Sequence, residues 1–461
     1  MLVHQLAEYA STLSFNHLPA PVVHEAKRRV LDSFACAYGA LSAPPCKISR
    51  RIAEAVNSKN GATLWGTFHR TTPDLATFAN GSLVRYLDFN DTYLSKEPAH
   101  PSDNIPACLA VAESAHITGK RLIEAIVLAY EVQCRLCDAA ALRPRGWDHV
   151  TFGAFSTSIA VAKLLNLSRE KMVHAINLAG ITAGALRQTR VGEVSLWKAC
   201  AFANASRNAV FLTYAAREGM TGPPAMFDGE KGFMKIISGE FSVHELGGNN
   251  GCTFKILDTF IKYYPVEYHA QSAVQAALAL RQQLKNTRGT FEPSEVASIE
   301  IESFDVAIEI IGRDREKWHP QTRETADHSL PYCAAVALID GKVAPPSFSP
   351  SRMKDKTLQD LIQKIRVVEN KIFTARYPAA MPTRIQLTMV DGQKLAAQVD
   401  HPKGHPRRPL SDEDIEEKFH SLADRRIGKF KANQLIQQIW ELEHYREMGN
   451  WIAKLPISMK G

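Results

Sequence analysis

The first half of the chain consists of segments whose apolar positions recur every three to four residues, the spacing of an α-helix. Near the N-terminus, Val3, Leu6, Tyr9 and Leu13 fall on one helical face. Most of the following segments are rich in Ala and Leu on several faces, which is typical of helices that pack against one another on most sides. The helices expected from this periodicity span 22–41, 75–87, 105–118, 121–142, 152–165, 169–186 and 198–218. The pattern predicts a compact all-helical domain.

The pattern changes near Pro265, after which segments with partial β-like alternation join the helical ones. The segments 384–390 and 393–399 flank Asp391-Gly392, and because an Asp-Gly pair suits a type I′ turn, we predict a β-hairpin there. Further strands are expected at 296–304 and 365–368, and further helices at 270–284, 329–339 and 356–364.

From Ser411 onward the chain is helical again, and Ser411 with the acidic residues after it has the pattern of a helix N-terminus. A helical tail of this kind would return to the first domain and make that domain discontinuous. We therefore predict a mainly α protein with a large all-helical domain, formed by 1–265 and 400–461, and a smaller α+β lid domain at 266–399.

The composition is that of a folded protein with a mild positive excess, since 55 Lys and Arg oppose 48 Asp and Glu. These basic residues are scattered, which argues against a nucleic-acid surface and fits a site for a small polyanion better. No apolar run approaches the ~20 residues of a membrane span, and the N-terminus lacks the features of a secretory signal or transit peptide. We expect a cytoplasmic protein that binds neither nucleic acid nor membranes.

The eight Cys are scattered, and only Cys134 and Cys137 form a C-x-x-C pair, inside a predicted helix. A zinc or redox site would need a second pair or His ligands at metal spacing. The pair is therefore interpreted as two buried small hydrophobic residues.

The densest group of polar residues lies in a predicted loop between two Ala-rich helices, where catalytic groups concentrate. His100 would approach Asp91 if this loop folds back, and a carboxylate beside an imidazole forms a proton-transfer pair that works near neutral pH. The spacing alone equally allows Asp88 and Asp103 to be helix caps and His100 to be an exposed loop residue.

Several motifs in this order resemble the signature of the 2-methylcitrate dehydratase family (MmgE/PrpD), which also includes cis-aconitate decarboxylases and an iminodisuccinate epimerase. The resemblance covers nearly the whole chain. The matching segments are Ala79-Asn-Gly81, Arg85-Tyr-Leu-Asp-Phe-Asn-Asp-Thr92, His100-Pro-Ser-Asp-Asn104, Trp147-Asp-His149, Trp197-Lys198 with Ala201-Phe-Ala-Asn204, Lys262-Tyr-Tyr-Pro-Val-Glu-Tyr-His269 with Ala270-Gln-Ser272, Asp327-His-Ser-Leu-Pro-Tyr332 and His401-Pro-Lys-Gly-His405.

The resemblance implies an enzyme that acts on small di- or tricarboxylates without a metal, an iron–sulfur cluster or another cofactor, and that forms a homodimer. The absence of cluster-ligand spacing among the Cys agrees with this. The reaction implied is dehydration of 2-methylcitrate to 2-methyl-cis-aconitate, with citrate as a further substrate. This elimination needs a base at the carbon, an acid at the leaving oxygen and cations that hold the carboxylates.

The site residues are carried over from the matching motifs. The catalytic residues expected are Asp91, His100, His149, Lys198 and His269. The substrate-binding residues expected are Arg85, Thr92, Lys262 and Tyr332. Lys262 and His269 would lie at the domain junction, where a lid could bring them over the substrate. Without the resemblance, His149 and Lys198 would be interpreted as surface residues and Tyr332 as a core residue.

Two alternatives stay open. The segments His100-Pro-Ser-Asp103 and Glu267-Tyr-His269 resemble the dehydratase branch, whereas Lys96-Glu-Pro-Ala99 departs from the Trp-containing stretch of the best-known members. Decarboxylation of cis-aconitate to itaconate, or another epimerase or isomerase reaction of the family, is therefore the second candidate. A non-catalytic scaffold of the same fold is the third, although a scaffold would have lost several of the five catalytic residues.

Overall fold

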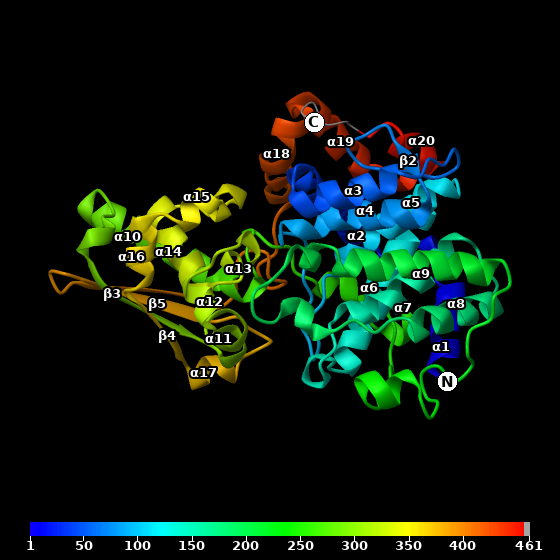
Figure 1. The fold of residues 1–461 in the computed structure, drawn as a ribbon, viewed down its shortest axis with the longest axis horizontal. Helices are drawn as coiled ribbons and strands as arrows, with labels where there is room; N and C mark the ends of the chain where they lie inside the picture. The colour runs from blue at the N-terminus through cyan, green and yellow to red at the C-terminus, as the bar shows by residue number, and fades with distance from the viewer. Residues whose placement is uncertain (456–461) are drawn as a thin grey trace. The chain divides into compact units, whose positions relative to one another are not determined.

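The computed structural model describes residues 1–455 and divides the chain into two compact units (Figure 1). Unit 1 contains 1–189, 196–261 and the segment that begins at Ser411, and unit 2 contains 190–195 and 262–410. The last six residues of the expected large domain, 456–461, lie outside the described residues. That either unit folds as an independent domain, with the boundaries predicted above, stays a prediction.

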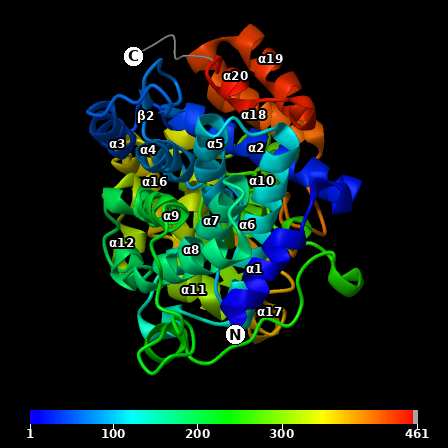
Figure 2. The ribbon, with the colours of Figure 1, turned by 90° about the vertical axis from the view of Figure 1, so that its right-hand side faces the viewer.

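Most helices of unit 1 lie where the apolar periodicity predicts them, whereas α3 was not predicted. Helix α7 is buried on nearly all sides because α6, α8 and α9 pack around it (Figure 2). Gly153 permits the close approach of α9, since a Cβ there would lie 2.4 Å from the Phe202 ring. The helices of this part are α1 (Leu2–Thr12), α2 (Ala20–Ala40), α3 (Pro44–Glu54), α4 (Pro73–Tyr86), α5 (Ile105–Ser114), α6 (Gly119–Ala139), α7 (Val150–Leu164), α8 (Arg169–Ile181) and α9 (Ala201–Arg217).

The C-terminal helices belong to unit 1 and lie beside its N-terminal helices (Figure 1). Ser411 caps helix α18 (Asp412–Ile427), which packs on α2. The buried Lys418 of α18 forms an ion pair with Asp32 of α2 at 2.5 Å and donates a hydrogen bond to the Phe89 carbonyl at 2.7 Å. This contact ties the C-terminal segment to the loop that follows α4. Helices α19 (Lys429–Trp440) and α20 (Met448–Ile452) complete the segment.

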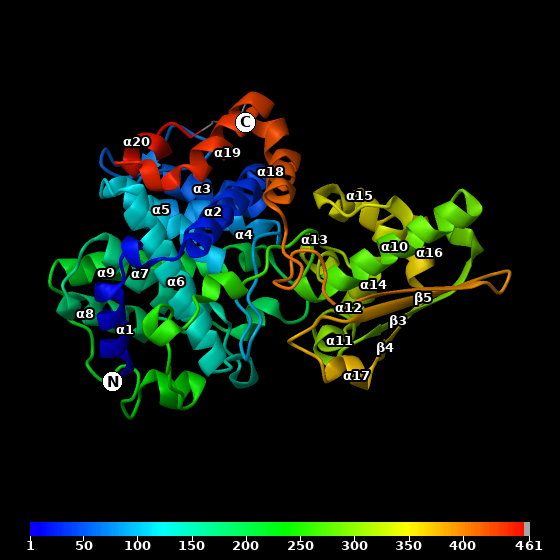
Figure 3. The ribbon, with the colours of Figure 1, turned by 180° about the vertical axis from the view of Figure 1, so that it is seen from behind.

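Unit 2 contains a four-stranded sheet in the order β4-β3-β5-β6, in which only the β3–β4 pair is parallel. Helix α10 covers one face of the sheet, and α14 packs against α10 (Figure 3). Alternate residues of β5 are buried against this helical layer, which is the pattern of a half-buried strand. The elements are α10 (Gln271–Arg288), β3 (Val296–Ser303), α11 (Asp305–Ile311), α12 (Arg315–Trp318), α13 (Arg323–Ala326), α14 (Leu330–Asp340), α15 (Pro350–Met353), α16 (Lys356–Ile362), β4 (Ile365–Glu369), α17 (Lys371–Thr374), β5 (Thr383–Met389) and β6 (Lys394–Val399).

The hairpin formed by β5 and β6 is present as predicted, but its predicted turn type is wrong. A type I′ turn needs positive φ at both central residues, and only Gly392 has it, at φ 86°. The loop instead closes with hydrogen bonds from the Gly392 N–H to the Met389 carbonyl at 3.0 Å and from the Met389 N–H to the Gln393 carbonyl at 2.9 Å. The Asp391 carboxylate accepts a hydrogen bond from the Gln393 N–H at 2.9 Å, which favours the four-residue loop.

The two Cys of the C-x-x-C pair are buried inside α6, as expected for small hydrophobic residues. Burial raises the pKa of both thiols, which disfavours the reactive thiolate. Among residues 1–455, no helix combines the length and the apolar character needed to cross a membrane.

Candidate active site

The loop that follows α4 is organised around the buried guanidinium of Arg85. Arg85 lies in the last turn of α4 and forms ion pairs with Asp88 and, at 3.7 Å, with Asp103. Asp88 has a left-handed backbone conformation, with φ 50°, which lets the chain turn sharply after the helix. The loop is therefore held by buried charge pairs, and Asp88 and Asp103 are more than helix caps.

His100 is anchored on both ring nitrogens. Nδ1 lies 2.6 Å from the backbone carbonyl of Asp91 and 3.2 Å from the Thr92 hydroxyl, while Nε2 lies 3.0 Å from the Arg85 guanidinium. A carbonyl only accepts and a guanidinium only donates hydrogen bonds. The tautomer with its proton on Nδ1 satisfies both contacts and leaves Nε2 as the acceptor.

The expected pairing of the Asp91 carboxylate with His100 is wrong. The fully buried carboxylate accepts hydrogen bonds from the Ser102 N–H at 3.0 Å and the Tyr130 hydroxyl at 2.6 Å. It also lies 3.8 Å from the Arg29 guanidinium. The side chain of Asp91 thus points away from the imidazole, and only its backbone carbonyl contacts it, which indicates a structural role.

His149 is buried beside His100 instead of lying on the surface. Their ring centroids are 5.6 Å apart in an edge-to-face arrangement. The Nδ1 atom of His149 lies 3.1 Å from the carboxylate of Asp148, which also accepts a hydrogen bond from the Val150 N–H at the start of α7. The structure therefore brings two of the predicted histidines together, with a carboxylate beside one of them.

Lys198 is also buried, with 4% of its surface exposed, and its ammonium lies 3.7 Å from the Asp88 carboxylate. It belongs to a short 3-10 helix, Leu196–Ala199, just before α9. A solvated surface Lys would not occupy this position. In unit 1 the structure thus gathers Arg85, Asp88, Thr92, His100, His149 and Lys198.

Unit 2 carries a second group of polar residues, centred on His269. The Nδ1 atom of His269 lies 2.7 Å from the Glu267 carboxylate, which also accepts a hydrogen bond from the His269 N–H at 2.8 Å. Burial opposes ionisation of Glu267, but His269, His328 and Lys262 outweigh it and lower the pKa of Glu267 to about 2. Glu267 and His269 therefore form the carboxylate–imidazole pair that was expected at Asp91 and His100.

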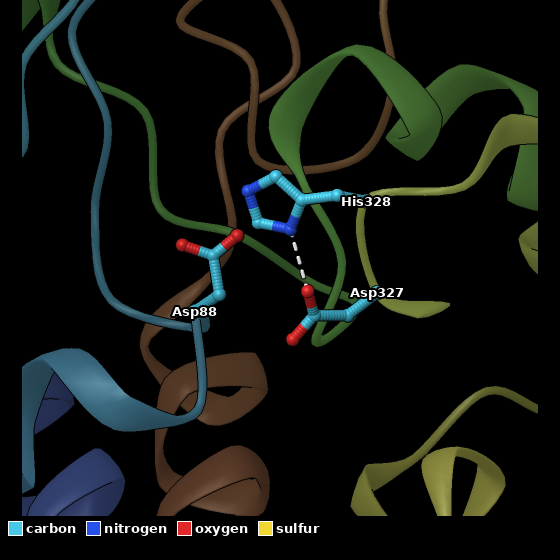
Figure 4. Close-up of side chains that lie close together, drawn as sticks. All are labelled: Asp88, Asp327 and His328. Atoms are coloured by element: carbon cyan, nitrogen blue, oxygen red, sulfur yellow. Dashed lines mark hydrogen bonds and ion pairs between the residues drawn. The ribbon is translucent and has the colours of Figure 1, made fainter. Parts of the chain in front are cut away.

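The loop before α14 adds a further pair to unit 2. The Nδ1 atom of His328 and the Asp327 carboxylate are hydrogen-bonded (Figure 4), and Arg323 lies 3.1 Å from the same carboxylate. The Asp327 carbonyl accepts a hydrogen bond from the Glu267 N–H at 2.8 Å. The two acid–imidazole pairs of unit 2 are therefore held next to each other by the backbone.

The expected role of Tyr332 in substrate binding is contradicted by its contacts. Its hydroxyl donates a hydrogen bond to the Ser347 carbonyl at 2.7 Å, and its ring lies in the hydrophobic core of unit 2. Tyr332 is at an inward-facing position of α14 and is a core residue. Lys262, by contrast, is fully buried and acts electrostatically on Glu267.

Sequence reasoning overlooked three carboxylates as members of the site, namely Asp88, Asp148 and Glu267. All three lie inside the family motifs, in the same motifs as predicted site residues. Their place in those motifs could therefore have indicated that they belong to the site. A metal site needs several ligand atoms close together. Among the described residues of either unit taken by itself, no three ligand atoms of His, Cys, Asp or Glu lie within 4.8 Å of one another.

Comparison with known families covers both halves of the chain. The MmgE/PrpD N-terminal domain matches residues 4–246, and the MmgE/PrpD C-terminal domain matches residues 264–442. The chain belongs to the MmgE/PrpD family. The mainly helical architecture with a small mixed sheet described here is consistent with the fold of that family.

Three similar proteins are named for two different enzymes. A 2-methylcitrate dehydratase of Escherichia coli (strain K12) is 30% identical over 82% of this chain and 81% of its own length. A 2-methylcitrate dehydratase of Cupriavidus necator is 30% identical over 87% of this chain and 86% of its own length. A cis-aconitate decarboxylase of Mus musculus is 26% identical over 94% of this chain and 88% of its own length.

Proposed function

We propose that this protein is a dehydratase of a small tricarboxylate, with 2-methylcitrate as its substrate and 2-methyl-cis-aconitate as its product. Family membership and the relatives over most of the chain support a hydro-lyase. The observation that carries the finer proposal is the half-buried imidazole of His100 beside the buried imidazole of His149, 5.6 Å apart in a unit that also buries Arg85 and Lys198. An elimination between two carboxylates needs this combination of proton-transfer groups and cations.

His100 is proposed as the base. Nδ1 carries the proton that is donated to the Asp91 carbonyl, so Nε2 has the lone pair, which accepts from Arg85 and becomes available when that guanidinium turns to a substrate carboxylate. In the proposed step, Nε2 takes the proton from the carbon α to a substrate carboxylate. The C–H electron pair forms the new C=C bond as the neighbouring C–O bond breaks.

His149 is proposed as the acid. The proposed step starts from the imidazolium, with the Asp148 carboxylate 3.1 Å from its Nδ1 atom, and the imidazolium gives its proton to the departing hydroxyl so that water leaves. The proton taken from carbon and the proton given to oxygen balance, so the reaction needs no oxidant, reductant or added cofactor.

Arg85 and Lys198 are proposed to bind the substrate carboxylates. Both cations are almost fully buried, where charge interactions are less screened than in water. Both contact Asp88, which holds them in place before the substrate binds. Thr92, whose hydroxyl is 3.2 Å from His100, completes the proposed binding set.

The residues of unit 2 that match the family motifs are kept as proposed site residues. His269 is oriented by Glu267, and a carboxylate that fixes the tautomer and the ring orientation of an imidazole is a common device of proton-transfer sites. Lys262 is proposed as a further carboxylate-binding cation. Asp91 and Tyr332 are no longer in the proposed set.

Decarboxylation of cis-aconitate is the second candidate, favoured by the similarity to the mouse protein over 94% of this chain. Decarboxylation releases carbon dioxide and needs no hydroxyl leaving group. A non-catalytic scaffold is disfavoured because burying this many ionisable groups is costly unless they serve a function.

The test incubates the purified protein separately with 2-methylcitrate, citrate and cis-aconitate. Alkene formation is followed by ultraviolet absorbance, and carbon dioxide release is followed in parallel. The proposal predicts alkene from 2-methylcitrate without carbon dioxide. Itaconate and carbon dioxide from cis-aconitate would establish the decarboxylase instead, and no turnover of any of the three would refute both.

The oligomeric state and location are proposed from the family resemblance. We propose a homodimer, and the exposed apolar side chains of Leu186, Trp197 and Phe211 in unit 1 supply surface for such a contact. Light scattering on the purified protein tests this, and a monomeric mass would refute it. The cytoplasmic location is also kept as a proposal, because a relative from Yarrowia lipolytica is named as mitochondrial.

A further inference from the structure

A cavity of about 530 Å³ in unit 1 is lined by helices α1 and α8, and no assignment above uses it. The two helices pack against each other (Figure 2). The side chains that line the cavity from α8 are spaced three or four residues apart, so they share one face of the helix. Small-molecule sites typically have volumes of about 300–1,000 Å³, so the size fits a ligand of that kind. The lining residues include His4 of α1, Arg169, Val173, His174 and Asn177 of α8, and Pro224.

The segment 222–224 lies close against α8 because Gly222 has no side chain. A Cβ at Gly222 would lie 2.7 Å from the Asn177 Cβ and 2.9 Å from the His174 carbonyl oxygen. The Gly222 N–H also donates a hydrogen bond to His174 Nδ1 at 3.3 Å. Because Nδ1 accepts here, the neutral imidazole carries its proton on Nε2, which is therefore a donor. This packing fixes both Pro224 and the His174 ring at the cavity.

The Asn177 side chain is buried at this cavity with its hydrogen bonds unmade. Only 1% of Asn177 is exposed, and neither its Nδ2 nor its Oδ1 atom has a hydrogen-bond partner among residues 1–455. The Asn80 amide, which is also buried, makes both kinds of bond, since it accepts from the Trp65 N–H at 3.0 Å and donates to the Thr63 carbonyl at 3.0 Å. An unpaired buried amide is costly, so a ligand that supplied both partners would offset that cost.

The cavity presents an adjacent donor and acceptor rather than a strong net charge. The exposed Arg169 is already ion-paired with Glu8, and the acidic Glu170 also lines the cavity. Val173 and Pro224 provide apolar contact surface. An Asn amide makes two hydrogen bonds to a partner that has a donor and an acceptor side by side, as it does with the edge of adenine. These features favour a small neutral molecule with a flat ring.

We infer that the cavity at Asn177 is a binding site for a small neutral molecule with an adjacent donor and acceptor, such as a nucleobase or a ring that carries a carboxamide. In the complex, Oδ1 accepts from the ligand amine and Nδ2 donates to the neighbouring ring nitrogen or carbonyl oxygen. His174 Nε2 supplies a further donor. None of these residues belongs to the proposed active site, and the inference does not depend on the proposed function.

The test measures binding directly, by isothermal titration calorimetry on the purified full chain. Adenosine is the probe for a nucleobase and nicotinamide the probe for a carboxamide, while purine riboside has the shape of adenosine without the amine. We expect adenosine or nicotinamide to bind the wild-type protein, and the affinity to fall about 10- to 100-fold in Asn177→Leu, as for the loss of one bidentate pair. If adenosine binds, purine riboside should bind the wild-type protein more weakly than adenosine. The matched control Asn57→Leu, at an exposed position of the same unit, should bind like the wild type.

The melting temperature provides a second readout that needs no ligand. Leu has nearly the shape of Asn but no polar group, so Asn177→Leu removes the unpaired amide and should raise Tm by about 2–5 °C. A fall in Tm would show that the amide stabilises the fold and would overturn the inference.

The binding results can overturn the inference independently of Tm. It fails if neither adenosine nor nicotinamide binds at millimolar concentration, or if the affinity is unchanged in Asn177→Leu. Equal affinity of the wild-type protein for adenosine and purine riboside would also overturn it. Dehydration of tricarboxylates bears only on the proposed function, so the two proposals succeed or fail separately.

Discussion

Replacing Asp91 by Asn should destabilise the protein more than it slows the proposed reaction, because the carboxylate is a buried structural anchor. The change keeps the shape of the side chain but removes the charge that accepts from the Tyr130 hydroxyl at 2.6 Å and lies 3.8 Å from Arg29. Burial raises the pKa of Tyr130, so its hydroxyl stays protonated and remains a donor. The loss of one charge-assisted hydrogen bond costs about 1.5–3 kcal/mol, and the acceptor to Ser102 can survive in the amide. In a unit of about 300 residues, a loss of this size lowers Tm by about 2–5 °C.

The comparison is His100→Gln, which removes a proposed base from the same loop without opening a cavity in the core. Here Tm should change by about 2 °C or less, while kcat falls by about 10²–10⁴-fold, as is typical of a general base. Differential scanning fluorimetry and initial-rate kinetics on both variants and the wild type provide the two quantities. If Asp91→Asn kept the wild-type Tm and lost kcat as severely as His100→Gln, the carboxylate would be catalytic and the structural assignment would be refuted.

Three further predictions concern other parts of the account. Lys198→Ala should lower kcat/KM by the equivalent of about 2–4 kcal/mol, with partial recovery in Lys198→Arg, and wild-type kinetics would return Lys198 to a structural role. Tyr332→Phe should leave kcat and KM unchanged and lower the free energy of unfolding by about 1–2 kcal/mol, because it removes only the hydrogen bond to Ser347. A large loss of kcat would show that Tyr332 belongs to the substrate site. The folded-state pKa of Glu267 is lowered to about 2, so its contribution to stability is present above the ordinary pKa of about 4.5 and is lost as the pH falls toward 2. The difference in unfolding free energy between wild type and Glu267→Gln should therefore shrink over that pH range in acid-unfolding curves. A constant difference would contradict the pairing of Glu267 with His269.

The helices and strands were predictable because they follow from local patterns. Apolar periodicity placed helices over 22–41 and 152–165, where the structure has α2 (Ala20–Ala40) and α7 (Val150–Leu164). Ser168 caps α8, and such an N-cap is a local feature because it needs only the neighbouring backbone. The turn type of the hairpin was mispredicted because Asp391 finds a better local hydrogen bond in a longer loop.

The side-chain contacts of the site were less predictable because they depend on residues far apart in the sequence. The motifs located the loop around His100, but the contact of Asp91 with Tyr130, 39 positions away, decided that its carboxylate points away from the imidazole. Glu267 lies two residues before His269 and was quoted only as part of a motif, although it makes the carboxylate–imidazole pair. Burial of Lys198, likewise, follows from the packing of α9 and α4 rather than from its own neighbours.

The central claim, metal-independent elimination from a tricarboxylate by side-chain proton transfer, is tested most directly by one nuclear magnetic resonance measurement. Chelator-treated protein is incubated with 2-methylcitrate in D2O, beside His100→Gln under the same conditions. The account predicts one unsaturated tricarboxylate without carbon dioxide, and deuterium in the recovered substrate at the carbon that loses its proton, with both signals greatly reduced in His100→Gln. Turnover that vanishes after chelation and returns with a divalent metal, or deuterium exchange that is unchanged in His100→Gln, would contradict it.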